Sequence, residues 1–428
     1  MSGIPIFGLF LQSNCMHMST VPQEISFDNT ELAFQYKTNK ELKKAHFLFN
    51  MMSNPLLVKV AASITPWAIK VGLPIKGIIR KTIFSQFVGG ETMEQTATVA
   101  KKLAAYNVQI ILDYGVEGKE GEENFDHACD VFIKVINHAA SEPNIPFMSV
   151  KVTGFARFAL LQELNIQMNK QSGKLLERYE KMLLAISPEQ KTEWFRVAGR
   201  VEKVCAHAAS KKIGVSIDAE ETWIQEPLDA LTTILMEKYN KEFPIVYNTL
   251  QHYRTDRVSF LKDCYEIARE RNFILGMKLV RGAYMEKERN RAKEMGYLSP
   301  IHTSKDDTDN DYNAAVNFCI SNIDVVAVVV ASHNEYSNLL ATRLLQQKGL
   351  PLNHPHVHWS QLYGMSDNIS FNLAHAGCGV SKYLPFGPIQ DVIPYLMRRA
   401  QENTSVKGQT GRELKLIQKE LARRSLSA

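Results

Sequence analysis

The chain has 428 residues, of which 45% are apolar and 22% charged, a balance typical of a globular protein and not of a disordered one. Its net charge of +5 is small for this length, and no basic run is interleaved with aromatic residues, so nucleic acid is excluded as an expected partner. The six cysteines are scattered without a close pair, which argues against a disulfide framework and a thiolate metal site and favours a reducing cytoplasm.

Residues 1–85 are predicted to form an N-terminal helical arm, with a capping-like start at Asn39-Lys-Glu-Leu42. Within this arm, residues 54–81 are apolar but carry basic residues and prolines, so they cannot form a membrane-spanning helix. No acidic residue occurs between Ala45 and Gly90. The stretch could therefore lie on an anionic membrane surface. Helices that pack onto the main domain are the favoured interpretation.

From residue 86 onward, short β-rich runs alternate with helical patterns, as in repeated βα units around a parallel sheet. The predicted strands are 86–90, 108–114, 147–154, 214–220, 244–251, 275–284, 325–333 and 357–363. Eight βα units over about 320 residues predict a distorted (βα)8 barrel, with its active site at the carboxyl ends of the strands. A doubly wound open sheet is the alternative. The barrel domain is predicted to span 86–428, with a helical insertion at about 156–212 after the third strand.

Lys151 and Asp218 end the third and fourth predicted strands, where barrel enzymes do their chemistry. A charged residue within a strand of valine and isoleucine is costly unless it is paired. The two residues are therefore candidates for the site. A buried ion pair of purely structural use, between Asp218 and either Lys151 or Arg398, is the alternative.

The predicted strand Lys278-Leu-Val-Arg-Gly-Ala-Tyr284 places Lys278, Val280, Gly282 and Tyr284 on one face, because side chains alternate along a strand. A small residue between a cation and an aromatic ring suits a flat ligand. Lys278 could donate to a ring nitrogen or carbonyl. The alternative is that Gly282 only eases closure of the barrel.

Ser332-His333-Asn334 ends the seventh predicted strand and begins a helix, and helix N-termini attract phosphate. Thr303 and Lys305, in a polar loop after the sixth strand, could bind the same phosphates. His354, His356 and His358 share a face of the eighth predicted strand and resemble a metal site. They lie mostly before or at the start of that strand, so we expect a structural role and no metal.

Tyr395, Arg398 and Arg399 are spaced i, i+3, i+4, so a helix starting after Pro388 places them on one face. Paired arginines grip planar carboxylates or phosphates, which indicates a carboxylate-bearing metabolite. The alternative is a solvated helix end with a salt bridge to Glu402. The nearby Gly377-Cys-Gly379 lacks the third glycine and the preceding strand of a dinucleotide fingerprint, so it does not indicate NAD.

Five segments in this order and spacing resemble the proline dehydrogenase family across about residues 86–405. They are Phe87-Val-Gly-Gly-Glu91, Ile217-Asp-Ala-Glu-Glu221, Leu279-Val-Arg-Gly-Ala-Tyr284, Ser332-His-Asn334 and Tyr383 through Asn403. The resemblance implies a barrel that holds noncovalent FAD and oxidises L-proline to Δ1-pyrroline-5-carboxylate. Hydride would pass from C5 of the ring to N5 of FAD as the first step of proline catabolism, and electrons would reach a quinone at the membrane surface.

By the same resemblance, residues that match the family's motifs take on its roles. Lys151, Arg398 and Arg399 would bind the substrate carboxylate, and Asp218 would hold Arg398 or a tyrosine in place. The residues expected to wall the pyrrolidine ring are Tyr284, Leu362, Tyr383 and Tyr395. The residues expected to bind FAD are Gln251, Lys278, Val280, Gly282, Thr303, Lys305, Ser332, His333 and Glu402. Many bacterial members carry arginine where this chain has Lys278.

The resemblance also implies a monofunctional enzyme, because no aldehyde dehydrogenase domain follows the barrel in this sequence. We expect a cytoplasmic protein, free or peripheral on the inner membrane, and its oligomeric state is unknown from the sequence. Two other functions stay open. A Schiff-base aldolase would use Lys151 or Lys278 as nucleophile. A non-catalytic docking scaffold would leave the converging charges unexplained.

Overall fold

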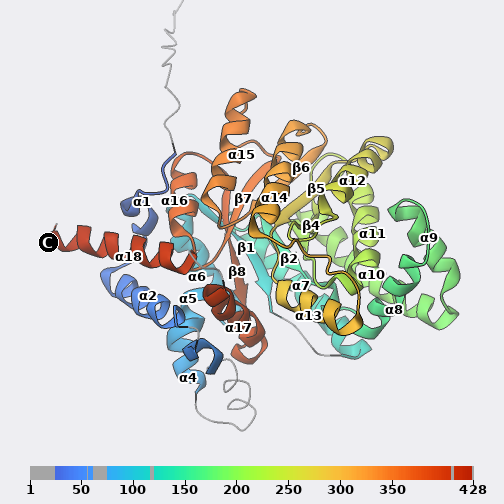
Figure 1. Cartoon of the computed structure of the whole chain (residues 1–428), viewed down its shortest axis with the longest axis horizontal. Helices are drawn as coiled ribbons and strands as arrows, with labels where there is room; N and C mark the ends of the chain where they lie inside the picture. Colours follow the sequence, from blue (N-terminus) through green and yellow to red (C-terminus); the bar gives the residue numbers. More distant parts are fainter. Residues whose placement is uncertain (1–24, 55, 61–74, 116–119, 406–408, 427–428) are drawn as a thin grey trace, which may run out of the picture.

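A computed structural model describes residues 25–54, 56–60, 75–115, 120–405 and 409–426, without the side chains of 401–405, 409 and 410. Its centre is a closed barrel in which each strand pairs in parallel with the next and β8 pairs with β1 (Figure 1). The strands are β1 (Val108–Tyr114), β2 (Phe147–Val150), β3 (Gly214–Ile217), β4 (Val246–Gln251), β5 (Leu275–Val280), β6 (Val326–Ala331), β7 (Val357–Leu362) and β8 (Val380–Phe386). The predicted fold class is confirmed.

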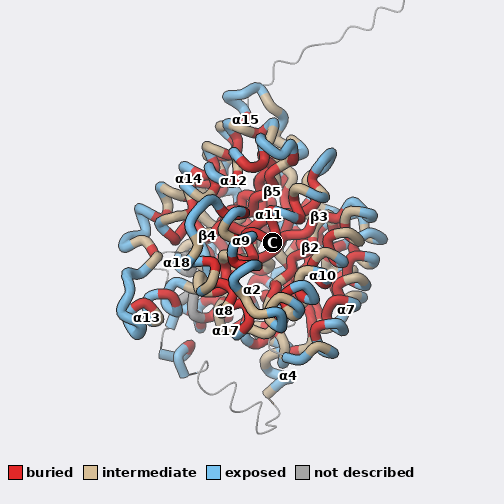
Figure 2. The backbone as a smooth tube through the Cα atoms, turned by 90° about the vertical axis from the view of Figure 1, so that its right-hand side faces the viewer, coloured by how far each residue is buried: buried red, intermediate tan, exposed pale blue. Residues whose placement is uncertain are grey.

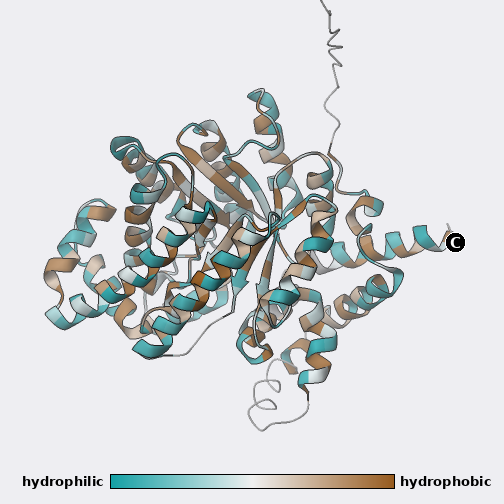
Figure 3. Cartoon of the chain, turned by 180° about the vertical axis from the view of Figure 1, so that it is seen from behind, coloured by the Kyte–Doolittle hydropathy of each residue, from teal (hydrophilic) through white to brown (hydrophobic). Residues whose placement is uncertain are grey.

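Helices surround the barrel, and Figure 2 shows the buried residues concentrated at the centre. The outer helices are α6 (Met93–Ala104), α7 (Glu122–Ser141), α10 (Pro188–Lys211), α11 (Thr222–Tyr239), α12 (Arg257–Arg271), α13 (Met285–Met295), α14 (Lys305–Ser321), α15 (Glu335–Gln347), α16 (Asp367–His375) and α17 (Ile389–Ser405). The strands are mainly hydrophobic, whereas the helices mix hydrophobic with hydrophilic residues (Figure 3). In β1, Ile110 and Leu112 join the core beneath the helices, so the alternating Ile111 and Asp113 face the barrel interior.

Three helices lie between β2 and β3, where the insertion was predicted. The helix α10 packs against α7 and α11 in the outer layer, whereas α8 (Phe158–Asn169) and α9 (Leu175–Ala185) pack on α11 and extend beyond it (Figure 1). A short 3-10 turn, η2 (Val152–Gly154), ends β2 early. The insertion therefore follows the second strand of the barrel and not the third.

The first predicted strand is wrong, and the strand that closes the barrel was not predicted, so the numbering of the other strands shifts by one. Residues 86–90 do not form a strand, because α5 (Ser85–Phe87) runs into an extended segment whose Gly89 N–H donates to Pro385 O over 2.8 Å. The strand that closes the barrel is β8. Its Pro385 has no N–H to donate to a neighbouring strand, and its Lys382 is buried and forms an ion pair with Asp367 at 2.9 Å.

The remaining helices gather at the opposite end of the molecule from α8 and α9 (Figure 1). They are α1 (Thr30–Phe34), α2 (Asn39–Met52), α4 (Lys76–Ile79), the π-helix η1 (Arg80–Phe84) and the C-terminal α18 (Gln409–Leu426). Thr38 and Glu41 form a capping box at the start of α2, one residue before the predicted start. Residues 1–24 and 61–74 of the predicted arm lie outside the described residues, so the division at residue 85 stays a prediction. Within the described part, no helix has the length and hydropathy needed to cross a membrane.

Candidate active site

Asp218 is the centre of a buried charge network at the carboxyl end of the barrel. It directly follows β3, and its carboxylate forms ion pairs with Lys278 of β5 and, at 3.7 Å, with Lys151 after β2. The Tyr383 hydroxyl on β8 donates to Asp218 Oδ2 over 2.8 Å. Four strands that are far apart in the sequence thus converge on one carboxylate.

A second carboxylate extends the network. Lys151 Nζ also lies 3.3 Å from Asp113 Oδ1 of β1, so two carboxylates alternate with two ammonium groups. Burial disfavours the charged form of Asp218, but Lys278 and Lys151 outweigh that effect and hold the pKa of Asp218 well below its usual range. Sequence reasoning missed Asp113, although a carboxylate in the apolar run Ile110 to Tyr114 is the same signal that identified Asp218.

Aromatic side chains line this end of the barrel. The Tyr383 ring centroid lies 5.3 Å from Lys278 Nζ. Burial raises the pKa of Tyr383 well above its usual value, so its hydroxyl is a neutral donor. Tyr284 is the residue directly before α13. Burial, and then Glu220, raises the pKa of Tyr284, whereas Arg398 and Lys151 act to lower it. Arg398 and Lys151, predicted to share one ligand, therefore act electrostatically on the same phenol.

The helix α17 begins directly after Pro388, as its sequence predicted. It follows β8 and lies beside the carboxyl end of the barrel. Tyr395 and Arg399 are 8% and 6% exposed, and the Arg399 guanidinium carbon lies 5.2 Å from the Tyr395 ring centroid. Leu362, at the end of β7, packs against the same apolar cluster as Tyr395. Burial, followed by Lys382, Arg399 and Arg281, lowers the pKa of His333 to about 3, so His333 is neutral at physiological pH.

Gln251 at the end of β4 presents an unsatisfied polar atom. Its Nε2 donates to Glu220 O over 2.9 Å, whereas its Oε1 is buried without a hydrogen-bond partner in the described structure. The neighbouring strand β5 ends at Val280, which is half-buried. A buried acceptor beside an apolar strand end fits a flat heterocycle with N–H groups, such as a flavin ring.

Arg281 was missed as a site residue, although it stands within the quoted motif. Its guanidinium pairs with Asp309 at 2.7 Å and donates to Ser332 Oγ over 2.6 Å and to Ser337 Oγ over 3.0 Å. A cation is thereby fixed at the N-terminus of α15, next to His333. This combination suits a phosphate group. An arginine that directly follows an apolar strand was the available signal.

Gly282 and Lys305, two of the predicted cofactor residues, are placed differently from their sequence interpretation, and so is Tyr284. Because β5 ends at Val280, its alternation does not reach Gly282, which has φ +123°, or Tyr284. A Cβ on Gly282 would lie 1.4 Å from Tyr253 Cε1, so the ring that approaches this glycine is Tyr253. Lys305 is the first residue of α14, pairs with Asp309 and is 66% exposed, and Thr303 precedes it in the loop. The Glu402 side chain lies outside those described, so its role stays a prediction.

The His354 and His356 rings lie 5.6 Å apart, whereas His358 makes different contacts. His358 faces the barrel interior, where its ring lies 5.0 Å from that of Phe147 and its Nε2 is 2.6 Å from Ser381 Oγ. His356 Nδ1 instead contacts Ile323 O at 2.7 Å. Among the described residues, no cluster of histidine, cysteine or carboxylate side chains could hold a metal ion.

A second buried charge cluster ties both ends of the chain to the barrel. Asp367, at the start of α16, accepts a hydrogen bond from Tyr36 over 2.8 Å and pairs with Lys37 and Lys382 at 2.9 Å each. Glu413 of α18 accepts the Ser366 N–H over 3.0 Å. Ser366 in turn contacts His333 Nδ1 at 2.8 Å, so this cluster supports the turn that carries the predicted phosphate site.

We expect Glu413→Gln to stabilise the protein at alkaline pH. Burial, and then the charge of Asp367, raises the pKa of Glu413 to about 7 from 4.5. Between pH 4.5 and about 7 the Glu413 carboxyl is ionised in the unfolded state but still protonated in the folded state. The wild-type free energy of unfolding therefore falls as pH rises. The glutamine variant should therefore be more stable by about 2–3 kcal/mol at pH 8 and show no advantage near pH 4.

Urea unfolding of both proteins across this pH range measures the difference. Replacement of the exposed Glu123 by glutamine is the matched control and should leave the profile unchanged. Parallel profiles for wild type and Glu413→Gln would contradict the buried-acid interpretation.

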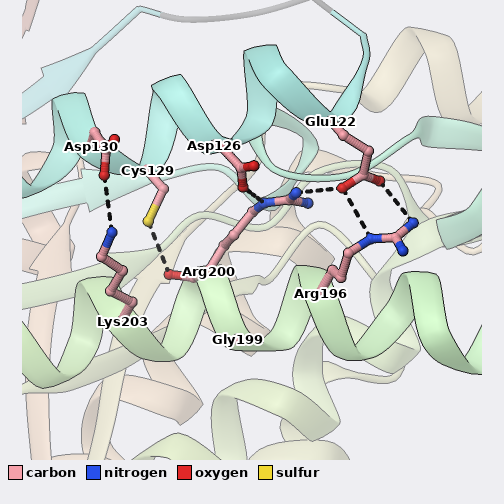
Figure 4. A pocket seen from close by; sticks show the side chains of 8 residues that line it. All are labelled: Glu122, Asp126, Cys129, Asp130, Arg196, Gly199, Arg200 and Lys203. Carbon is pink, nitrogen blue, oxygen red and sulfur yellow. Dashed lines mark hydrogen bonds and ion pairs between the residues drawn. The ribbon is translucent and has the colours of Figure 1, made fainter.

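A cavity of about 700 Å³ lies between α7 and α10, two helices of the outer layer (Figure 4). Its charged side chains pair with one another: Glu122 with Arg196 at 3.0 Å, Asp126 with Arg200 at 2.7 Å, and Lys203 with Asp130 at 2.9 Å. These pairs join the two helices. They account for the charges that line the cavity without a ligand.

Comparison with known proteins supports the sequence resemblance. A family model described as proline dehydrogenase matches residues 96–412. The chain is 32% identical over 388 residues to Proline dehydrogenase 1, mitochondrial, of Dictyostelium discoideum, covering 83% of this chain and 67% of that protein. It is 33% identical to the carbapenem antibiotics biosynthesis protein CarD of Pectobacterium carotovorum subsp. carotovorum (82% and 86% covered). It is 31% identical to the hydroxyproline dehydrogenase of Mus musculus (94% and 95% covered).

A solved structure shares the fold. The crystal structure of proline utilization A from Bdellovibrio bacteriovorus, inactivated by N-propargylglycine, matches with a TM-score of 0.66 and 19% sequence identity. The match covers 88% of this chain, which spans only 38% of that protein. At this identity the likeness establishes a common barrel architecture.

Proposed function

This chain belongs to the proline dehydrogenase family, and on that basis we propose that it is an FAD-dependent enzyme that oxidises L-proline to Δ1-pyrroline-5-carboxylate. The observation that carries the proposal is the convergence on Asp218 of Lys278, Lys151 and Tyr383, beside the arginines of α17. Such a site combines fixed cations with a neutral aromatic wall. A small, ring-shaped carboxylate fits both.

The residues of this chain would act mainly by positioning. Arg398, Arg399 and Lys151 would bind the carboxylate, and Tyr284, Leu362, Tyr383 and Tyr395 would wall the ring. Asp218 would hold Tyr383 and Lys278 in place through the contacts described above. When bound, FAD would supply the hydride acceptor. The protein would therefore need only to bind the proline ring with its amine unprotonated, and no covalent nucleophile would be required.

The cofactor would lie across the carboxyl ends of β4 to β6. Gln251, Lys278, Val280 and Gly282 would line the flavin ring, and Thr303, Lys305, Ser332 and His333 would hold its ribityl and diphosphate groups. To these we add Arg281, because it is already fixed beside Ser332 at a helix N-terminus. A membrane quinone would accept the electrons.

The ultraviolet-visible spectrum of the purified protein tests this proposal. The protein should be yellow, and anaerobic L-proline should bleach the flavin absorbance. A short-chain quinone should restore the absorbance, whereas NAD should not. Stoichiometric flavin without bleaching would leave the cofactor assignment intact and eliminate proline as substrate. A colourless protein would remove the cofactor assignment as well.

The aldolase alternative is disfavoured by the contacts of the two candidate lysines. A Schiff-base lysine must present its amine to a carbonyl, whereas carboxylates occupy the amines of both lysines. Lys278 is paired with Asp218, and Lys151 lies between Asp113 and Asp218. Trapping with borohydride and a carbonyl substrate should therefore give no adduct.

Hydroxyproline is the competing substrate, since several relatives, the Mus musculus protein among them, are named for it. We expect proline to be preferred over trans-4-hydroxyproline at least tenfold, because Tyr383 is held by Asp218 and leaves little room for a hydroxyl group. Tyr383→Ser should narrow this ratio by weakening proline oxidation and sparing hydroxyproline. Steady-state efficiencies for both substrates and both proteins measure the effect. Equal efficiencies in the wild type, or an unchanged ratio in the variant, would remove Tyr383 from this role.

A further inference from the structure

Ser366, in the turn between β7 and α16, has a backbone conformation that serine rarely adopts. Its φ of +51° and ψ of +45° lie in the left-handed region, which glycine tolerates and other residues find strained. In the same turn Gly364 has a φ of +79°, so glycine is used elsewhere in this short segment. A strained residue that keeps its side chain in such a turn points to a use for that side chain.

The backbone of Ser366 is held from two helices. Its N–H donates to Glu413 Oε2 of α18 over 3.0 Å, and its carbonyl oxygen accepts the Ser370 N–H of α16 over 3.1 Å. Ser366 itself is buried. The C-terminal helix and α16 together therefore fix the position of the Ser366 hydroxyl.

The Ser366 hydroxyl lies 2.8 Å from Nδ1 of His333. Among the described residues this hydroxyl has no other hydrogen-bond partner. If Nδ1 carried a proton and donated it, the hydroxyl proton would be buried without an acceptor, which is costly. The hydroxyl therefore donates to Nδ1, and the proton of the neutral imidazole lies on Nε2.

His333 thus offers Nε2–H as a hydrogen-bond donor beside fixed cations. Burial, followed by Lys382, Arg399 and Arg281, lowers the pKa of His333 to about 3, so the ring stays neutral. His333 is half-buried, and its Nε2 makes no hydrogen bond within the described part of the chain. A neutral N–H donor among cations suits an oxygen atom of an anionic ligand.

We propose that Ser366 is a positioning residue for the cofactor site: it fixes the tautomer of His333, so that Nε2–H donates to an oxygen of the ribityl or diphosphate part of FAD. Glu413 holds Ser366 in place from α18. The proposal rests on the proposed function for the identity of the ligand alone. The tautomer of His333 and its dependence on Ser366 belong to the protein itself.

Nitrogen NMR of the histidine rings, in isotope-labelled protein, tests the tautomer without any catalytic readout. The ring signals that His333→Gln removes should be those of a neutral imidazole protonated at Nε2. Ser366→Gly deletes the hydroxyl and also relieves the left-handed backbone, so this variant should fold. Its His333 signals should shift toward a mixture of both tautomers. A wild-type His333 protonated at Nδ1, or an unchanged His333 spectrum in Ser366→Gly, would overturn the proposal.

Flavin affinity, measured by the flavin released on serial dilution of the holoprotein, tests the consequence for the ligand. Ser366→Gly should bind FAD about five- to tenfold more weakly than the wild type, the effect of one hydrogen bond. Glu413→Gln keeps an acceptor for the Ser366 N–H and should match the wild type. Glu413→Leu removes that acceptor and should weaken FAD binding as Ser366→Gly does.

The matched control is Ser381→Ala, near the start of β8. Its hydroxyl also contacts a neutral histidine, since it lies 2.6 Å from Nε2 of His358, whose pKa burial lowers to about 3. This variant should change the His358 signals and keep the flavin affinity of the wild type. Equal flavin release from wild type and Ser366→Gly would overturn the assignment of Nε2–H to the cofactor. A wild type that binds no flavin would overturn the proposed function, whereas the NMR spectrum decides the tautomer in either case.

Discussion

Asp218→Asn is expected to lower the free energy of unfolding by about 3–5 kcal/mol, the cost of leaving buried charges without their partner. The change keeps the size of the side chain and an acceptor for Tyr383 but removes the negative charge that separates Lys278 from Lys151. These two ammonium groups would then repel each other across the site. Because they line the predicted substrate and flavin sites, proline turnover should be lost as well.

The pH dependence of this effect has a definite sign. The folded-state pKa of Asp218 is depressed, so the carboxylate contributes stability above its unfolded pKa of about 4, and the contribution is lost only as pH falls further. The difference between wild type and Asp218→Asn should therefore stay constant from about pH 5 to pH 8. Denaturant unfolding at several pH values measures it.

Asp126→Asn provides the control for this variant. Asp126 also forms an ion pair, with Arg200 at 2.7 Å, but its side chain is 67% exposed. Its replacement should cost less than about 1 kcal/mol and leave turnover unchanged. A fully stable and active Asp218→Asn protein would show that the network is incidental to both fold and function.

Arg398→Met and Arg399→Met are each expected to cost about 2–4 kcal/mol in kcat/KM for proline, the scale of removing one partner from a desolvated charge pair. Flavin content should be retained, because neither arginine is predicted to hold the cofactor. Most of the loss should appear in KM, since carboxylate binding is the proposed role. Steady-state kinetics and the flavin-to-protein absorbance ratio measure both effects.

Two comparisons test the carboxylate interpretation directly. Arg412→Met on α18 is the matched control, because its side chain is 41% exposed and its ion pairs with Asp28 and Glu335 involve no residue predicted to bind the carboxylate. It should change kcat/KM by less than about 1 kcal/mol. If wild-type protein oxidised proline methyl ester as well as proline, the carboxylate would not be what the arginines recognise.

The barrel and much of its site were determined by local features of the sequence. β-rich runs and helical patterns can each be recognised within a few neighbouring residues. Seven of the predicted strands therefore overlap strands of the barrel, and α17 begins where expected. Asp218 and Lys151 were identifiable because a charge at the end of an apolar strand is costly without a partner. That argument requires no knowledge of the partner's position.

Tertiary contacts decided the rest, because they join residues that are distant in the chain. Lys382 and Pro385 appear unsuited to a barrel strand until Asp367 neutralises the lysine within the fold. The partner of Gly282 is Tyr253, whose ring fills the space of a Cβ. The roles of Asp113 and Arg281 likewise depend on Lys151, Asp309 and Ser332. Pairing energies of this kind arise only at contact distance, and local sequence patterns carry no information about such distances.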